Sequence, residues 1–125
     1  MTYAYWCVLI AIIMPYVFTI TAKAGARNFD NNNPRAFLEN LQGWRRRAHW
    51  AQQNAFEAFA PFGVAVIIAH QHLVAQDLLN KIAISFVICR LLHGIFYISD
   101  KSCLRSLSWL GGMICVVSLF ILSSL

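Results

Sequence analysis

The sequence predicts an all-α integral membrane protein, folded as a four-helix up-down bundle. Its composition, the lengths of its apolar segments and its short connections all indicate this class. Of its 125 residues, 59% are hydrophobic and 12% are charged, whereas a soluble domain has about 25% charged residues. Crossing the hydrocarbon core of a bilayer takes about 20 apolar residues in a helix, and four segments approach that length. The chain length suits a single domain over residues 1–125.

The first two predicted helices differ in where their polar residues lie. Residues 3–21 are almost wholly apolar and include Pro15, where a kink is expected. Residues 44–73 begin with "WRRRAHWAQQN" and become apolar only in their second half. The only long polar connection joins these two helices. It contains an Asn-Asn-Asn-Pro turn and then "PRAFLENL", which predicts a short interfacial helix that begins at Pro34.

The last two predicted helices are bounded by short connections. Residues 78–97 are apolar apart from a few polar positions, chiefly Lys81, Arg90 and His93. Residues 104–125 contain "WLGGMICVVSLFIL", which has no charged residue. The connections "HQHLVAQD" and "SDKSC" are short, and short connections join antiparallel neighbours. The four helices are therefore expected to run alternately up and down.

Basic residues gather in two of the three connections. Eight of the ten lysines and arginines lie in or beside the first and third connections, and "HQHLVAQD" has none. The positive-inside rule then predicts that residues 22–46 and 98–105 face the cytoplasm and that both termini face outward. Short loops and the lack of a retention signal favour a bacterial inner membrane. No basic-aromatic patch accompanies the net charge of +5, so membrane lipid and not nucleic acid is the expected partner.

Polar side chains recur at helical spacing on three of the helices. Successive members of each set are three or four residues apart in the sequence. Each set is therefore expected to share one helix face. These sets are Arg47, Trp50, Asn54, Glu57 and Pro61; Arg90, His93 and Tyr97; and Tyr16, Ile20, Lys23 and Arg27.

Charged groups at membrane depth need partners, because an ionised side chain at the helix centre costs about 2.5–3.5 kcal/mol. Two interpretations stay open. In the first, Glu57 and Arg90 form a buried pair that only locks helix packing. In the second, the polar faces line a site for a charged ligand. Four arginines (Arg27, Arg47, Arg90 and Arg105) face one carboxylate. This excess of cations favours an anionic ligand, either a lipid phosphate or a polar metabolite with carboxylates.

Two motifs resemble those of a known family. "RAHWAQQNAFEAF" is similar to the helix-two signature of the MAPEG family, the membrane-associated proteins in eicosanoid and glutathione metabolism. The shared core is an Arg, an Asn seven residues later and a Glu three further on, followed by an aromatic residue and Pro. "RLLHGIFY" resembles the family's Arg-x-x-His/Tyr-x-x-x-Tyr sequence. The resemblance covers almost the whole chain.

The resemblance implies a homotrimer that binds glutathione between neighbouring subunits near the cytosolic side. The matching positions are Arg27, Arg47, Asn54, Glu57, Arg90, His93, Tyr97 and Ser106, with Arg105 as the residue that stabilises the thiolate. Glutathione offers two carboxylates to the arginines and an ammonium to Glu57. Its thiolate would attack a lipophilic small-molecule electrophile that enters from the bilayer.

One position departs from the family pattern, and the function stays open. Active members carry an Arg four residues before the Asn, where this chain has Trp50, a residue type common at the membrane–water boundary. The leading hypothesis is a glutathione-dependent transferase or peroxidase. The alternatives are a MAPEG-fold binding or structural protein without glutathione chemistry, and a small exporter that uses Glu57. The scattered cysteines and histidines predict neither a disulfide nor a metal site.

Overall fold

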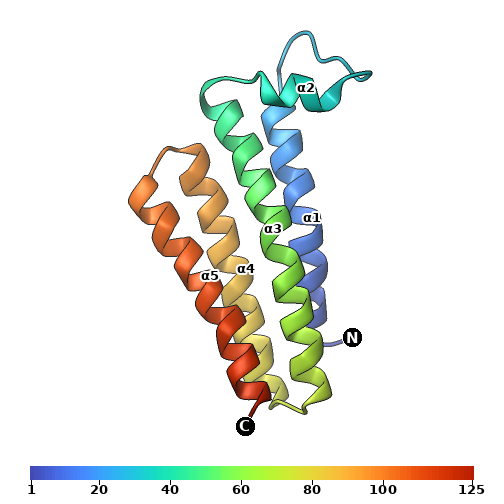
Figure 1. Cartoon of the computed structure of the whole chain (residues 1–125), viewed down its shortest axis with the longest axis vertical. Coiled ribbons are helices and arrows are strands. Elements are labelled where there is room, and N and C mark those ends of the chain that lie inside the picture. Colours follow the sequence, from blue (N-terminus) through green and yellow to red (C-terminus); the bar gives the residue numbers. More distant parts are fainter.

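The structure is a computed structural model that describes residues 1–125, and all of its regular elements are helices. They are α1 (Tyr3–Lys23), α2 (Pro34–Glu39), α3 (Gly43–Gln71), α4 (Gln76–Ile98) and α5 (Ser102–Ser123). The four long helices run side by side in alternating directions, and short α2 lies across one end (Figure 1). We call this the α2 end; α1 and α4 finish there, and α3 and α5 begin there. The all-α class predicted from the sequence is confirmed.

Three of the long helices are long and apolar enough to cross a membrane, namely α1, α4 and α5. The sequence predicts four crossings, so α3 is the helix that differs. It is the longest, with 29 residues, but the polar residues of its first half lower its apolarity. The observed helix ends differ from the predicted ones by one or two residues; the predicted 44–73, for example, is Gly43–Gln71.

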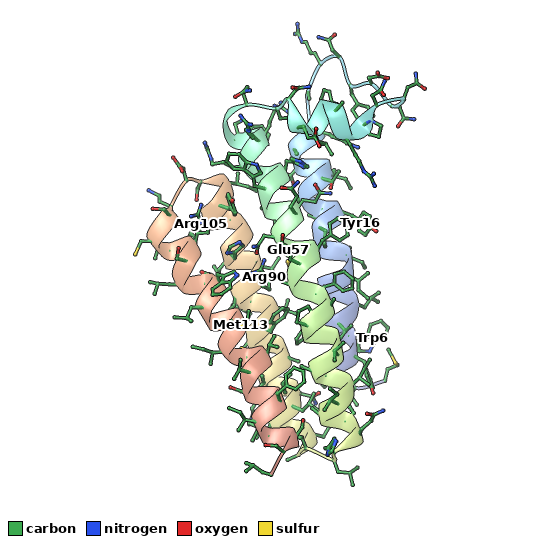
Figure 2. The ribbon with its side chains drawn as sticks, viewed as in Figure 1. Trp6, Tyr16, Glu57, Arg90, Arg105 and Met113 are labelled. Carbon is green, nitrogen blue, oxygen red and sulfur yellow. The ribbon has the colours of Figure 1, made fainter.

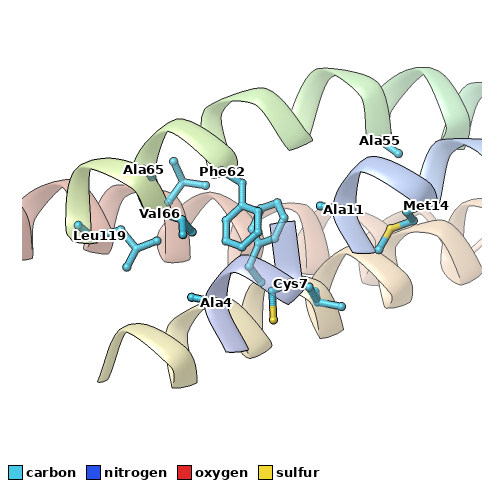
Figure 3. Packing of buried hydrophobic residues seen from close by; sticks show 14 of the residues in the cluster. Ala4, Cys7, Ala11, Met14, Ala55, Phe62, Ala65, Val66 and Leu119 are labelled. Carbon is cyan, nitrogen blue, oxygen red and sulfur yellow. The ribbon is translucent and has the colours of Figure 1, made fainter. Parts of the chain in front are cut away.

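Small and aromatic side chains fill the core between the helices. Helix α1 packs chiefly on α3, and α5 packs chiefly on α4. The buried alanines of this core include Ala4, Ala11, Ala55 and Ala65 (Figure 3). Ala69 belongs to the same core. Small residues let helix axes approach closely, which favours packing in a membrane where the hydrophobic effect does not hold helices together. Phe62 of α3 stacks on Phe86 of α4 with ring centroids 3.9 Å apart, and this stack joins the two halves of the bundle.

The α2 end is closed by a short helix and by arginines. Helix α2 begins at Pro34, as the sequence predicts, and its Leu38 packs with Leu41, Ala22 and Ala48 in a second small core. Arg45 Nη1 donates hydrogen bonds to the carbonyls of Ala24 (2.5 Å) and Ala22 (3.2 Å). The α1, α2 and α3 segments are therefore tied together at this end.

The turn between α4 and α5 sets the position of Arg105. The Lys101 N–H donates to the Phe96 carbonyl at 2.8 Å and the Asp100 N–H to the Tyr97 carbonyl at 3.2 Å. With Asp100 at a φ of 61°, this pattern is a Schellman motif, which ends a helix and reverses the chain. Arg105 consequently lies in the first turns of α5, with its guanidinium carbon 4.7 Å from the centre of the Tyr97 ring.

Candidate functional site

Three adjoining cavities lie where α3, α4 and α5 meet, in the region of Glu57, Arg90 and Arg105 (Figure 2). Asn54 lines all three cavities, which therefore adjoin one another, and we refer to them together as the groove. We name the cavities by their position relative to the α2 end. The upper cavity, nearest the α2 end, has about 260 Å³, the lateral cavity about 320 Å³ and the lower cavity about 210 Å³.

The upper cavity gathers most of the site residues predicted on α4 and α5. It is lined by Asn54, His93, Tyr97, Arg105, Ser106 and Trp109. His93 Nδ1 lies 3.2 Å from the carbonyl oxygen of Arg105. A carbonyl only accepts hydrogen bonds, so Nδ1 carries a proton and donates it to this oxygen. Nε2 of the same ring is buried and has no hydrogen-bond partner. The cavity thus combines a guanidinium, a phenol, a hydroxyl and an imidazole.

The lateral cavity contains the carboxylate of Glu57, which is a predicted site residue. It is lined by Trp50, Gln53, Asn54, Glu57 and Tyr97. Glu57 is exposed and forms no ion pair, because the only ion pair in the chain joins Lys81 Nζ to Asp77 Oδ2 at 2.6 Å. The interpretation of Glu57 and Arg90 as a buried pair is therefore wrong within one chain. Arg90 Nη2 instead donates to Asn54 Oδ1 at 2.5 Å.

The lower cavity combines one cation with an apolar floor. Arg90 lines it and is 4% exposed, and its Nε is buried without a partner. Its apolar lining consists of Ala58, Pro61, Phe86, Trp109, Gly112, Met113 and Val116. Gly112 leaves space beside the arginine, because a Cβ at this position would lie 3.4 Å from Arg90 Cδ.

Two predicted site residues lie outside the groove of their own chain. Arg47 lines none of the three cavities, and its Nε donates to the Ile98 carbonyl at 3.0 Å, which caps the end of α4. Arg27 is exposed in the connection that follows α1. The predicted helical stepping from Tyr16 to Arg27 is wrong at its last position, because α1 ends at Lys23 and the chain turns through Gly25 at a φ of 66°.

Sequence reasoning missed the contribution of α5 beyond Arg105 and Ser106. Trp109, Gly112, Met113 and Val116 all line the groove. Their spacing from Arg105 is 4, 3, 1 and 3 residues, so they continue one face of α5. Residues 109–117 of α5 include no charged or hydroxyl-bearing residue, and an apolar helix segment in a membrane protein gives no sign of whether it meets lipid or lines a cavity.

Comparison with known families gives one match. The MAPEG family model matches residues 3–125, nearly the whole chain. Neither the curated proteins nor the solved structures contain a match.

Proposed function

The chain belongs to the MAPEG family and is an integral membrane protein, and from this premise we propose that it is a glutathione-dependent transferase or peroxidase acting on lipophilic electrophiles. The family includes glutathione-dependent enzymes. The observation that carries the proposal is the convergence of Asn54, Glu57, Tyr97 and Arg105 on two adjoining cavities. These groups come from three different helices. Together they offer an amide, a carboxylate, a phenol and a guanidinium, which can pair with the charged and polar groups of glutathione.

Glutathione fits the charges of the upper and lateral cavities. Its ammonium would lie against Glu57, which has no cation of its own chain within ion-pair distance. Its thiol would lie in the upper cavity near Arg105. A guanidinium stabilises the thiolate over the thiol, and the thiolate is the nucleophile that attacks an electrophile. Ser106 and Tyr97 add hydroxyl groups that can hydrogen-bond to sulfur or to peptide oxygens.

The exposure of Glu57 favours assembly with further copies of the chain. An ionised carboxylate facing hydrocarbon is costly, and one chain leaves Glu57 exposed. We propose that a homotrimer covers the groove and that glutathione lies at each subunit boundary. Arg27, which is exposed and outside its own groove, would then serve a neighbouring subunit. In this assembly α3 crosses the membrane as the fourth helix, shielded by α1, α4 and the neighbouring copy.

We further propose that the α2 end faces the cytoplasm of a bacterium and that the protein lies in the inner membrane. Eight of the ten basic residues belong to the two connections at this end or to their edges, which supports this orientation by the positive-inside rule. The groove would then open where cytosolic glutathione is available, while its lower part would meet molecules dissolved in the bilayer.

A binding or structural protein without glutathione chemistry is the alternative, and two observations favour it. Trp50 lines the lateral cavity at the position where active family members are expected to carry an arginine. Arg47 donates to the Ile98 carbonyl, so its Nε is occupied within the chain. Both features reduce the number of cations available to a carboxylate of glutathione.

Calorimetric titration of glutathione into the detergent-purified protein tests the proposal. We expect saturable binding that the Glu57→Gln substitution weakens about tenfold or more, because a hydrogen bond to a charged group is worth roughly 1.5–3 kcal/mol. Glu39→Gln is the matched control, since Glu39 is exposed on α2 and lines none of the three cavities. No binding at millimolar glutathione by a folded, oligomeric sample would reject the transferase and leave the alternative.

A further inference from the structure

We propose that the end of α1 and the connection that follows it bind the head group of an anionic phospholipid, with the phosphate held by Lys23 beside Phe29. We call Lys23, Phe29 and Phe37 the head-group site. None of these residues lines a cavity of the groove. The site is therefore separate from the one proposed for glutathione, and it does not depend on glutathione binding.

Lys23 lies at the level of the lipid head groups. It is the last residue of α1, which has 21 residues and is therefore about 31 Å long. The hydrocarbon core of a bilayer is about 30 Å thick, and α1 is apolar enough to cross it. A crossing helix of this length has its last residue where the hydrocarbon ends and the phosphates begin. Short α2 lies across the same end of the bundle (Figure 1).

The ammonium group of Lys23 is held in position but has no polar partner. Its Nζ lies 4.4 Å from the centre of the Phe29 ring, which is a cation–π contact. The only lysine whose side chain forms a hydrogen bond or an ion pair is Lys81, with Asp77. An ammonium group has three N–H donors, so those of Lys23 are available to the oxygens of a phosphate.

Phe29 links the ammonium to the folded chain. Its ring packs edge-to-face on Phe37, with ring centroids 5.1 Å apart, and Phe37 packs against the small core around Leu38 and Leu41. Phe29 is nevertheless 38% exposed, so part of its ring can contact the apolar portion of a lipid. Cations beside exposed aromatic rings are typical of segments that lie in the membrane interface. The site thus offers a cation to the phosphate and an aromatic surface to the same lipid.

Arg45 frees Lys23 from a capping role. Lysine in the last turn of a helix ordinarily interacts with the free carbonyls of that end. At the end of α1 the carbonyls of Ala22 and Ala24 already accept hydrogen bonds from Arg45 Nη1. The charge of Lys23 is therefore not needed to end the helix.

The charge around the site favours an anionic lipid over a zwitterionic one. Residues 23–47 include six basic and two acidic residues. One of the acids, Asp30, does not neutralise Lys23, because its carboxylate accepts hydrogen bonds from the Asn32 N–H at 2.9 Å and from Asn33 Nδ2 at 3.1 Å. A zwitterionic head group has the same phosphate but adds an ammonium, which this excess of cations repels.

Native mass spectrometry of the detergent-purified protein tests the site. The probes are dioleoyl phosphatidylglycerol and dioleoyl phosphatidylcholine, which share their acyl chains and phosphate and differ in net charge. We expect the first lipid bound per chain to show about a tenfold preference for phosphatidylglycerol. Lys23→Met should lower this preference about fivefold, which corresponds to about 1 kcal/mol for one basic residue at a membrane surface. Lys23→Arg should keep the preference, and Phe29→Leu should lower it about two- to threefold by removing the cation–π contact.

Lys101→Met is the matched control. Lys101 is exposed at the same end of the bundle, in the turn between α4 and α5, and it lines none of the three cavities. Its substitution removes the same charge and should leave the preference unchanged. Equal losses from Lys23→Met and Lys101→Met would show a diffuse attraction to the whole basic end and would overturn the site.

A second arm separates a lipid from a soluble phosphate. Glycerol 3-phosphate carries a comparable phosphate without acyl chains, and at millimolar concentration it should not displace bound phosphatidylglycerol. Displacement would identify a site for soluble phosphate esters and overturn the lipid as occupant. No glutathione is present in these measurements, so they remain decisive whichever way the calorimetric test turns out.

Discussion

The three consecutive arginines at the start of α3 have different partners. Arg45 donates to the carbonyls of Ala22 and Ala24 at the end of α1, and Arg47 donates to the Ile98 carbonyl at the end of α4. Arg46 lies over the Trp50 ring at 5.2 Å from its centre. Cations are unfavourable at a helix N-terminus and favourable at a C-terminus. Arg45 and Arg47 lie at the N-terminus of α3, which is unfavourable for a cation. Their hydrogen bonds to the C-terminal ends of α1 and α4 offset this cost.

The Arg45→Met substitution should destabilise the protein at the α2 end. Methionine keeps the length of the side chain and loses both hydrogen bonds to α1. We expect the free energy of unfolding to fall by roughly 1–2 kcal/mol, which is less than for a fully buried charged hydrogen bond because Arg45 is half-exposed. Unfolding in mixed micelles, followed by circular dichroism, measures this. Arg35→Met is the control, because Arg35 is exposed on α2 and has no side-chain hydrogen bond; equal losses in both variants would contradict the capping role.

Spacing predicts which face a residue occupies but not which partner it chooses. The spacing of three and four residues correctly predicts that Asn54, Glu57 and Arg90 line the same groove. It cannot distinguish a bond from Arg90 to Glu57 from the observed bond to Asn54, because that choice depends on side-chain reach and on the distance between α3 and α4. For the same reason the sequence does not predict that Arg47 points to the end of α4.

The long helices were predictable because their apolar segments have the length of a membrane crossing. What holds the helices together was less predictable, because it rests on small residues with no periodic signal. Gly94 of α4 shows this. A Cβ built on Gly94 would lie 2.0 Å from Phe18 Cζ and 2.5 Å from Phe18 Cε1, so α1 and α4 approach each other at a point where any side chain would collide.

The Gly94→Ala substitution should therefore destabilise the bundle, although alanine favours helix formation. Phe18 is itself buried in the core, so its ring has little room to move aside. We expect a loss of about 1–3 kcal/mol in the free energy of unfolding, as is typical of overpacking. Gly63→Ala is the matched comparison, since its Cβ would meet only an ordinary contact. It should gain up to about 1 kcal/mol from helix propensity. Similar effects of the two substitutions would show that the α1–α4 approach is not a constraint.

The sequence predicts where helix α5 begins but not which of its apolar residues line the groove. Its start is predictable from "SDKSC", and Arg105 is identified by its charge. Trp109, Gly112 and Met113 belong to a continuous apolar stretch. Whether they meet lipid or line a cavity depends on the angle at which α5 packs on α4. That angle is a property of the folded bundle.

At the scale of the whole molecule, polarity changes along the bundle axis. The basic connections and the upper cavity lie at the α2 end, and the apolar lower cavity lies farther along the axis (Figures 1 and 2). Under the proposed function, the polar substrate and the lipophilic one reach the groove from opposite directions. This arrangement requires that the α2 end face the compartment that holds the polar substrate.

Labelling of single cysteines with a membrane-impermeant maleimide tests this orientation. Cys103 is exposed at the α2 end, and Leu73 is 88% exposed in the connection between α3 and α4 at the opposite end. In spheroplasts of a bacterial host, Cys103 should react only after the membrane is permeabilised. The Leu73→Cys substitution in a Cys103→Ser background should react without permeabilisation, and Cys103→Ser alone gives the background from the three remaining cysteines within the helices. The reverse pattern would put the basic loops outside, against the positive-inside rule. Cytosolic glutathione would then have no access to the upper cavity, and the proposed transferase would lose its polar substrate.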